Sequence, residues 1–165
     1  WKIIGNIPYE ITSPIIFKLL DEASLVQRAV FLIQKEVAMR ITAKPKTKAY
    51  GILSVITQAR ATCERLFDVS AKSFLPPPDV ISSVIRLIFD MPLHNNEQWF
   101  RTVVKAAFNQ RRKTIRNALR GSSLSIPAAT LDDAFAKINI DGGRRPETLS
   151  VAEFQHLAHL LQGES

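Results

Sequence analysis

The sequence lacks most of the features that mark a secreted, membrane-spanning or metal-binding protein. Its single cysteine, Cys63, excludes an internal disulfide framework and is typical of a reducing cytosol. Three scattered histidines and this cysteine do not give the ligand spacing of a metal site. No stretch approaches the roughly 18 apolar residues that a membrane-spanning helix needs, and no signal peptide is visible. We therefore expect a cytoplasmic protein that binds no metal, with Cys63 in the core.

Acidic residues are missing from one long stretch of a chain that carries a net charge of +7. No Asp or Glu occurs between Gln98 and Arg120, a stretch with seven basic residues, and another acid-free patch spans Lys44 to Lys48. A solvated helix face usually mixes charges of both signs, so these clusters favour a polyanionic partner, either nucleic acid or an anionic membrane surface. The residues predicted to contact nucleic acid are Lys44, Lys46, Lys48, Arg111, Arg112, Lys113, Arg116 and Arg120.

Apolar runs and turn residues predict two parts in the 165 residues. Up to residue 92, strands alternate with helices, which indicates an open α/β sheet with helices on both faces. The expected strands are 1–6, 28–34, 62–69 and 82–89. A helix capped by Ser13 follows the first strand, and two more, at 35–41 and 50–60, follow the second. From residue 93 to 165 the pattern is helical only, with helices near 97–109, 111–120, 128–137 and 150–162. Residues 1–92 and 93–165 are thus the predicted domains.

The first strand leads into the turn Asn6-Ile7-Pro8-Tyr9. Ligands of open α/β sheets bind beyond the carboxyl ends of the strands, which is where this turn lies. Pro8 pushes Ile7 into an extended conformation, so the Ile7 carbonyl can point away from the sheet beside the Asn6 amide. Two neutral acceptors and an aromatic ring suit a planar group with an amino donor, such as a nucleobase. An ordinary turn with Tyr9 packed on the sheet is the alternative.

A second aromatic residue, Phe74, precedes three consecutive prolines in the connection between the last two strands. Prolines reduce the conformational freedom of a loop and so hold a neighbouring ring in place. A stiff loop of this kind could present Phe74 to a second face of a flat ligand. Alternatively, Phe74 only covers the end of the sheet.

These motifs resemble those of one family. The Asn6–Tyr9 turn is similar to the Asn/Asp-x-Pro-Tyr motif of adenine-N6 methyltransferases. The segments FLIQKEVAMRI, YGILSV, SFLPPPDVISSVI, FNQRRKTIRNAL and RRPETLSVAEFQHL resemble, in order and spacing, the bacterial small-subunit ribosomal RNA adenine dimethyltransferases. The resemblance covers nearly the whole chain. Relatives that act on the large subunit share the turn but resemble NQRRKT less closely.

The resemblance implies a role for each residue of the turn. Asn6 would touch the target amino group and S-adenosylmethionine, and Ile7, held extended by Pro8, would supply a backbone carbonyl. Tyr9 would stack on a flipped adenine, and Phe74 would contact its other side. The implied fold is the C-terminal half of a Rossmann-like methyltransferase sheet followed by a small all-helical domain. The implied partner is small-subunit ribosomal RNA or the assembling small subunit. We expect the protein to be a monomer and not to bind a membrane.

One departure from the family concerns the cofactor. None of the six glycines forms the G-x-G pattern of a glycine-rich cofactor loop, and the chain starts at Trp1, inside an apolar stretch. We therefore expect a fragment that lacks most of its cofactor site and is inactive alone. The alternatives are a nucleic-acid-binding factor that kept this fold without catalysis, and a methyltransferase of large-subunit RNA.

Overall fold

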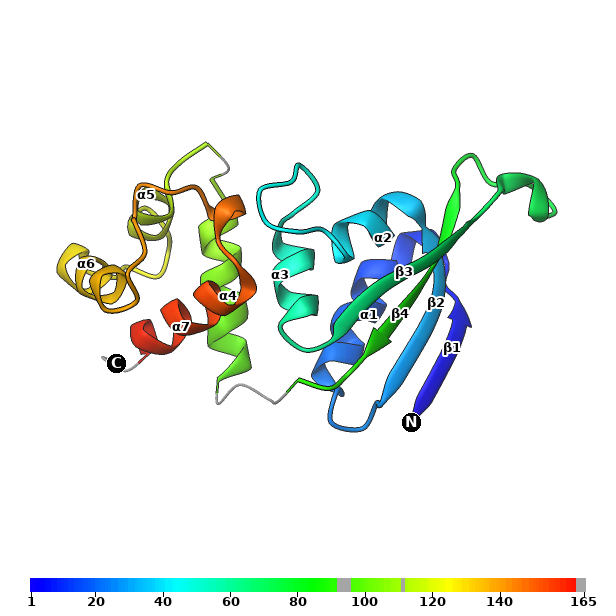
Figure 1. Ribbon diagram of the computed structural model, residues 1–165, viewed down its shortest axis with the longest axis horizontal. Helices are drawn as coiled ribbons and strands as arrows, with labels where there is room; N and C mark the ends of the chain where they lie inside the picture. The colour runs from blue at the N-terminus through cyan, green and yellow to red at the C-terminus, as the bar shows by residue number, and fades with distance from the viewer. Residues whose placement is uncertain (92–95, 111, 163–165) are drawn as a thin grey trace.

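The computed structural model describes residues 1–91, 96–110 and 112–162 (Figure 1). Four strands form one mixed sheet in the order β1-β2-β4-β3. They are β1 (Lys2–Asn6), β2 (Arg28–Gln34), β3 (Thr62–Val69) and β4 (Ser82–Ile88). β1 is parallel to β2, whereas β4 is antiparallel to both of its neighbours. The predicted bounds of β2 and β3 are confirmed. β4, the last strand in the sequence, lies inside the sheet rather than at its edge.

Three helices of the first part cover one face of this sheet. They are α1 (Thr12–Asp21), α2 (Lys35–Ile41) and α3 (Ile52–Gln58). The strands bury alternate residues against them, including Phe31 and Ile85. On the opposite face Ile4 and Phe67 are exposed. The expectation of helices on both faces is therefore wrong for the described residues. The crossover connections from β1 to β2 and from β2 to β3 run in the same direction across the sheet. Because crossovers are almost always right-handed, two that run in the same direction place their helices on the same face.

The first helix begins without the cap that the sequence indicated. Ile11, not Ser13, is its N-cap residue, and no side chain caps the helix there. Thr12 instead turns its hydroxyl back to the Pro8 carbonyl, 3.3 Å away, and is buried. Ser13 and Pro14 lie within the first turn, where a proline costs no intrahelical hydrogen bond. This arrangement ties the start of α1 to the turn that follows β1.

The second part of the chain is helical, as predicted. It consists of α4 (Glu97–Phe108), α5 (Ile115–Arg120), α6 (Ala128–Lys137) and α7 (Val151–Gln162). The predicted bounds of α6 are confirmed. The helix expected at 111–120 begins only at Ile115, because the Thr114 hydroxyl accepts a hydrogen bond from the Asn117 amide and caps the helix there.

The last helix is held by a reciprocal cap and an ion pair. The Ser150 amide donates to the Glu153 carboxylate at 2.6 Å, and the Glu153 amide donates to the Ser150 hydroxyl at 3.2 Å. Arg144 also donates to the Glu153 carboxylate, at 2.6 Å. Burial opposes ionisation of Glu153, but the hydrogen bonds from Arg144 and Ser150 outweigh it, so the pKa of Glu153 is lowered.

The sheet part and the helical part share one hydrophobic core. Tyr50, just before α3, meets Phe108 of α4 edge to face with ring centroids 6.3 Å apart. Phe108 in turn stacks on Phe154 of α7 at 5.6 Å. The predicted boundary at residues 92 and 93 falls on a segment outside the described residues. The division into two domains stays a prediction, and the contacts around Phe108 join its two sides.

Candidate nucleobase site

The turn after β1 is fixed to the sheet through its backbone. The Ile7 amide donates to the Leu32 carbonyl at 3.1 Å, which continues the pairing of β1 with β2 by one bond. The Ile7 side chain is buried in the core. Tyr9–Ile11 then form one 3₁₀ turn, η1, whose Ile11 amide donates to the Pro8 carbonyl at 3.2 Å. The position expected from the sequence, at the carboxyl end of a strand, is confirmed for this turn.

Two acceptors of the turn face no protein donor. Within residues 1–91, 96–110 and 112–162, no hydrogen bond reaches the Ile7 carbonyl or the Asn6 side chain. Asn6 is exposed, and Pro8 has an extended backbone with ψ at 134°. Strand pairing satisfies the amide of Ile7 but not its carbonyl. The turn therefore keeps two neutral acceptors free for a ligand with amino donors.

The Tyr9 ring is fixed at its far end. Its hydroxyl lies 2.8 Å from the hydroxyl of Ser82, the first residue of β4. Ser82 is fully buried, whereas Tyr9 is half-buried and keeps part of its surface for a ligand. Sequence analysis did not identify Ser82. Its distance of 73 residues along the chain from Tyr9 left no local signal.

Phe74 lies in the loop between β3 and β4, directly after the short helix η2 (Ala71–Ser73). This loop extends beyond the same end of the sheet as the turn that follows β1 (Figure 1). Phe74 is half-buried, and its neighbour Leu75 is almost fully exposed. The loop leads directly to Ser82, which bonds to Tyr9. Ser82 thus links the two aromatic segments, and a joint role of both rings in binding one base stays a prediction.

The three lysines between α2 and α3 are all exposed. Among the described residues, no carboxylate pairs with Lys44, Lys46 or Lys48. The Lys46 amide donates to the Glu147 carbonyl at 2.7 Å, which anchors the loop to the helical part. Lys46 has a φ of 68°, a left-handed conformation that is unusual for a residue with a side chain. The loop holds its charges outward at some conformational cost.

The basic residues around α5 do not all lie on one helix. Arg112 and Lys113 are exposed but precede the helix, so they do not continue the face that carries Arg116 and Arg120. Arg116 pairs with Asp132 of α6 at 3.0 Å, so the acid-free stretch of sequence does not leave the whole cluster without acids in the fold. Arg111 lies outside the described residues. Arg112, Lys113 and Arg120 remain as cations without a carboxylate partner in the described structure.

One residue of the acid-free stretch has a structural role instead. Arg101 is buried in α4, where it pairs with Asp21 of α1 and with Glu97. Its charge is compensated by acids that lie outside the stretch in the sequence. Counting basic residues along the sequence therefore overstates the charge that faces solvent.

The part of the chain that the structure describes contains neither a cluster of metal ligands nor a cysteine with a lowered pKa. No group of three or more potential ligands gathers there, and none of its helices is long and apolar enough to cross a membrane. Cys63 donates to the Ala61 carbonyl at 3.3 Å within β3. Burial, together with the charge of Asp90, raises the pKa of its thiol to about 12. Cys63 is therefore protonated at neutral pH.

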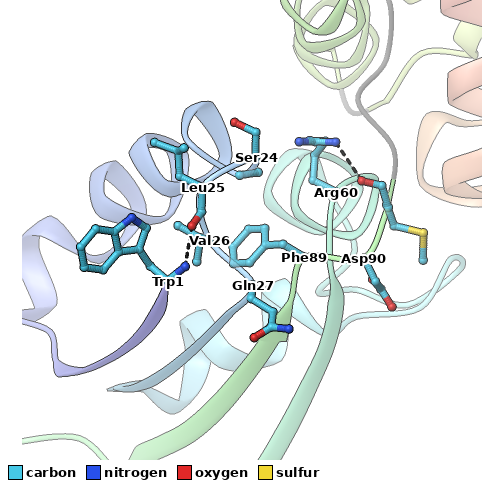
Figure 2. Close-up of a pocket in the computed structure, with 10 residues that line it drawn as sticks. Trp1, Ser24, Leu25, Val26, Gln27, Arg60, Phe89 and Asp90 are labelled. Atoms are coloured by element: carbon cyan, nitrogen blue, oxygen red, sulfur yellow. Dashed lines mark hydrogen bonds between the residues drawn. The ribbon is translucent and has the colours of Figure 1, made fainter.

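A separate hollow lies at the opposite end of the sheet from the turn (Figure 2). It has a volume of about 660 Å³, and Trp1, Leu25 and Phe89 contribute to its lining. Arg60 also lines it and donates to the Met91 carbonyl at 3.0 Å. The free acceptors of the candidate site do not face this hollow.

Comparison with known proteins decides which family this geometry represents. The family described as "Ribosomal RNA adenine dimethylase" matches residues 1–162. The chain belongs to this family. A "Ribosomal RNA small subunit methyltransferase A" of Anaeromyxobacter sp. (strain K) is 46% identical over 163 residues, which cover 96% of this chain and 56% of that protein. One of the same name from Syntrophotalea carbinolica is 46% identical over 167 residues, covering 98% and 62%. The chain thus spans little more than half the length of these dimethylase relatives.

Two solved structures of similar fold are consistent with this membership. The crystal structure of a dimethyladenosine transferase from Plasmodium falciparum matches with a TM-score of 0.81 at 25% identity, over 95% of this chain and 65% of that one. The 23S rRNA methyltransferase ErmE matches with a TM-score of 0.68 at 24% identity, which shows a shared fold alone. The Rossmann-like methyltransferase fold that the sequence implied is therefore confirmed.

Proposed function

We propose that the complete gene product containing this chain uses S-adenosylmethionine to dimethylate the N6 amino groups of two adjacent adenosines in small-subunit ribosomal RNA. The observation that carries this proposal is the pair of free acceptors, Asn6 and the Ile7 carbonyl, at the carboxyl end of β1. The names of the relatives that share 46% of their residues with this chain support the choice of RNA.

The two acceptors address the central difficulty of the reaction. The lone pair of an adenine amino group is delocalised into the ring, so this nitrogen is a poor nucleophile. Acceptors on both N–H bonds favour a pyramidal nitrogen whose lone pair points at the methyl donor. Asn6 and Ile7 supply two such acceptors without charge. The reaction then depends on positioning and electrostatics more than on a general base.

The aromatic residues would hold the base once it has left its stack. Extruding a base costs a few kcal/mol, and each aromatic contact recovers about 1–3 kcal/mol. Tyr9 offers a half-buried ring beside the free acceptors. Phe74 approaches from the β3–β4 loop at the same end of the sheet. Two faces of one adenine could thus be covered from two separate elements.

The residues present fit one edge of a cofactor site. Asn6 stands exposed at the end of β1, where its amide is free to approach both the base and the donor. Bound S-adenosylmethionine would supply an electrophilic methyl group on sulfur. Among the described residues, β1 pairs with β2 alone, and no glycine-rich loop lies beside it. We therefore assign only Asn6 to the cofactor and propose that residues 1–165 alone are inactive.

The exposed cations would bind the RNA backbone. In Figure 1 the loop at 42–51, which carries the three lysines, and the β3–β4 loop both reach the upper edge of the molecule. Phosphate contacts position a nucleic acid without reading its sequence. We propose that this edge binds the small-subunit RNA of an assembling ribosomal subunit, that the protein acts as a monomer, and that it works in the cytoplasm.

Methyl transfer tests the proposal directly. The complete gene product, wild type and Asn6→Ala, is incubated with radiolabelled S-adenosylmethionine and small ribosomal subunits that lack the modification. We expect wild-type transfer of four methyl groups per subunit and a loss of at least about 100-fold in Asn6→Ala, because a transition-state contact is removed. RNA affinity should change little. Binding of the subunits without methyl transfer by the wild type would instead identify a non-catalytic RNA-binding factor.

A further inference from the structure

A buried hydroxyl beside the candidate site has a role that the turn alone does not explain. Ser82 is fully buried, and its hydroxyl contacts the Tyr9 hydroxyl at 2.8 Å. A buried hydroxyl requires a hydrogen-bond partner, and Tyr9 provides it. Because Tyr9 is half-buried, its hydroxyl could instead bond to water. The Tyr9 hydroxyl therefore does not need Ser82 as a hydrogen-bond partner, and the main effect of the contact on Tyr9 is to restrain its side chain.

The strand end that carries Ser82 is held on both sides. Ser82 pairs with Gln34 of β2 and with Val69 of β3. The preceding residue, Ile81, accepts a hydrogen bond from the Lys35 amide at 2.9 Å. An anchor within a paired strand moves less than a loop residue would.

A second pair of side chains fixes the same strand end. The Ser83 hydroxyl donates to the Asp68 carboxylate at 2.6 Å, and Lys35 pairs with the same carboxylate at 2.8 Å. The Lys35, Ser83 and Arg65 contacts lower the pKa of Asp68, so this carboxylate is ionised at neutral pH. Ser82 is thus supported independently of Tyr9.

Tyr9 needs such an anchor because its side chain makes no other hydrogen bond among the described residues. The ring turns about two side-chain torsions, and the short η1 turn leaves it on the protein surface. A hydrogen bond at the hydroxyl, the atom farthest from the backbone, limits rotation about the first torsion most effectively. The direction of the ring axis is then set before a ligand arrives, whereas rotation about the second torsion leaves the hydroxyl in place and is limited by the packing of the half-buried ring.

We propose that Ser82 is a positioning residue that orients the Tyr9 ring for stacking on the target adenine. This inference rests on the proposed function, since it assumes that Tyr9 contacts the base. Preorganisation of this kind accelerates the chemical step, because the base is held in one orientation relative to the acceptors of the turn. Binding of RNA, which depends on many phosphates, should be unaffected.

A double-mutant cycle tests the contact from both sides. Tyr9→Phe keeps the ring and removes one hydroxyl, and Ser82→Ala removes the other. For the complete gene product we expect each change to lower kcat by about 3- to 10-fold, the range for one hydrogen bond, with KM for the small subunit unchanged. The double variant should be no slower than the slower single variant, because both changes remove the same interaction.

Two controls separate positioning from folding. Ser83→Ala removes the neighbouring buried hydroxyl, which bonds to Asp68 rather than to Tyr9. Pairing of Ser82 with Gln34 and Val69 still holds the strand end in this variant, so kcat should stay within about twofold of wild type. Thermal unfolding of each variant reports any loss of the fold. Tyr9→Phe changes a half-buried side chain, so it tests the contact even if Ser82→Ala does not fold. Wild-type kcat in Tyr9→Phe, or losses that multiply in the double variant, would overturn the proposal.

A second measurement separates this inference from the proposed function. If the wild-type protein transfers no methyl group, the proposed function fails. The same variants are then compared by the fluorescence of small-subunit RNA in which 2-aminopurine replaces one of the two proposed target adenosines, because stacking on Tyr9 quenches its emission. Weaker quenching in Tyr9→Phe and Ser82→Ala than in wild type supports the positioning role. Equal quenching in all three proteins contradicts it.

Discussion

The carboxylate of Glu97, the first residue of α4, lies 3.2 Å from the guanidinium of Arg60, just beyond α3. The same carboxylate pairs with Arg101, which also reaches Asp21 at the end of α1. The Arg60 and Arg101 side chains are 3% and 10% exposed, so two buried positive charges depend on Glu97. This cluster connects the first helix of the helical part to the sheet part.

Loss of Glu97 should destabilise the whole fold. We expect Glu97→Gln to lower the free energy of unfolding by about 3 kcal/mol, because it leaves the buried Arg60 without a carboxylate partner and Arg101 with Asp21 alone. Chemical denaturation of the complete gene product measures this. Glu36→Gln is the control, since its pair with Arg40 is exposed and should contribute less than about 1 kcal/mol. An effect of Glu97→Gln as small as that of the control would contradict a structural role for the cluster.

The cap of α7 should make part of the stability dependent on pH. The pKa of Glu153 is lowered in the folded protein from its ordinary value of 4.5, so its contribution is fully present above about pH 5 and declines as the pH falls through 4.5. Denaturation of wild type and Glu153→Gln at pH 7 and pH 4 should therefore show a larger difference at pH 7. A difference that is the same at both values, or grows at pH 4, would show that Glu153 is not held ionised by Arg144.

Phe74 should act through its ring. Phe74→Ala is expected to lower kcat/KM for methylation by about 5- to 100-fold, the equivalent of one base-stacking contact, whereas Phe74→Tyr should stay within about threefold of wild type. The half-buried position of Phe74 requires a parallel measurement of folding. If both variants lose stability but keep wild-type turnover per folded molecule, Phe74 only covers the end of the sheet.

The cations without acid partners should dominate the salt dependence of RNA binding. Each phosphate contact contributes about 0.7–0.9 to the slope of log affinity against log salt concentration. Changing Arg112 and Arg120 together to Gln should flatten the slope by about 1.4–1.8. Arg116→Gln, which removes a cation already paired with Asp132, should change it less. An equal or greater effect of Arg116→Gln would show that RNA displaces Asp132.

Local patterns predicted the elements well, but not how they meet. A continuous apolar run identified β2 with its observed bounds, because a buried strand needs such a run. The bounds of β3 were also predicted correctly, although this strand mixes charged and apolar residues and is mostly exposed. The start of α5 is misplaced because the six basic and polar residues at 109–114 carry no helical period. Thr114, which caps the helix, is a residue type that favours this position. The Arg116 pair with Asp132 and the Tyr9 contact with Ser82 join residues that the chain separates widely. No local pattern predicts such contacts.

The place of β4 in the sheet constrains how the chain folds. β4 is the last of the four strands to be synthesised, yet it lies between β2 and β3. Until residues 82–88 leave the ribosome, β2 and β3 have no partner between them, and the hydroxyl that holds Tyr9 does not yet exist. Such long-range pairing slows folding and makes it cooperative. The candidate site therefore forms late and all at once, and a nascent chain that stops before β4 would have the turn without the Ser82 contact.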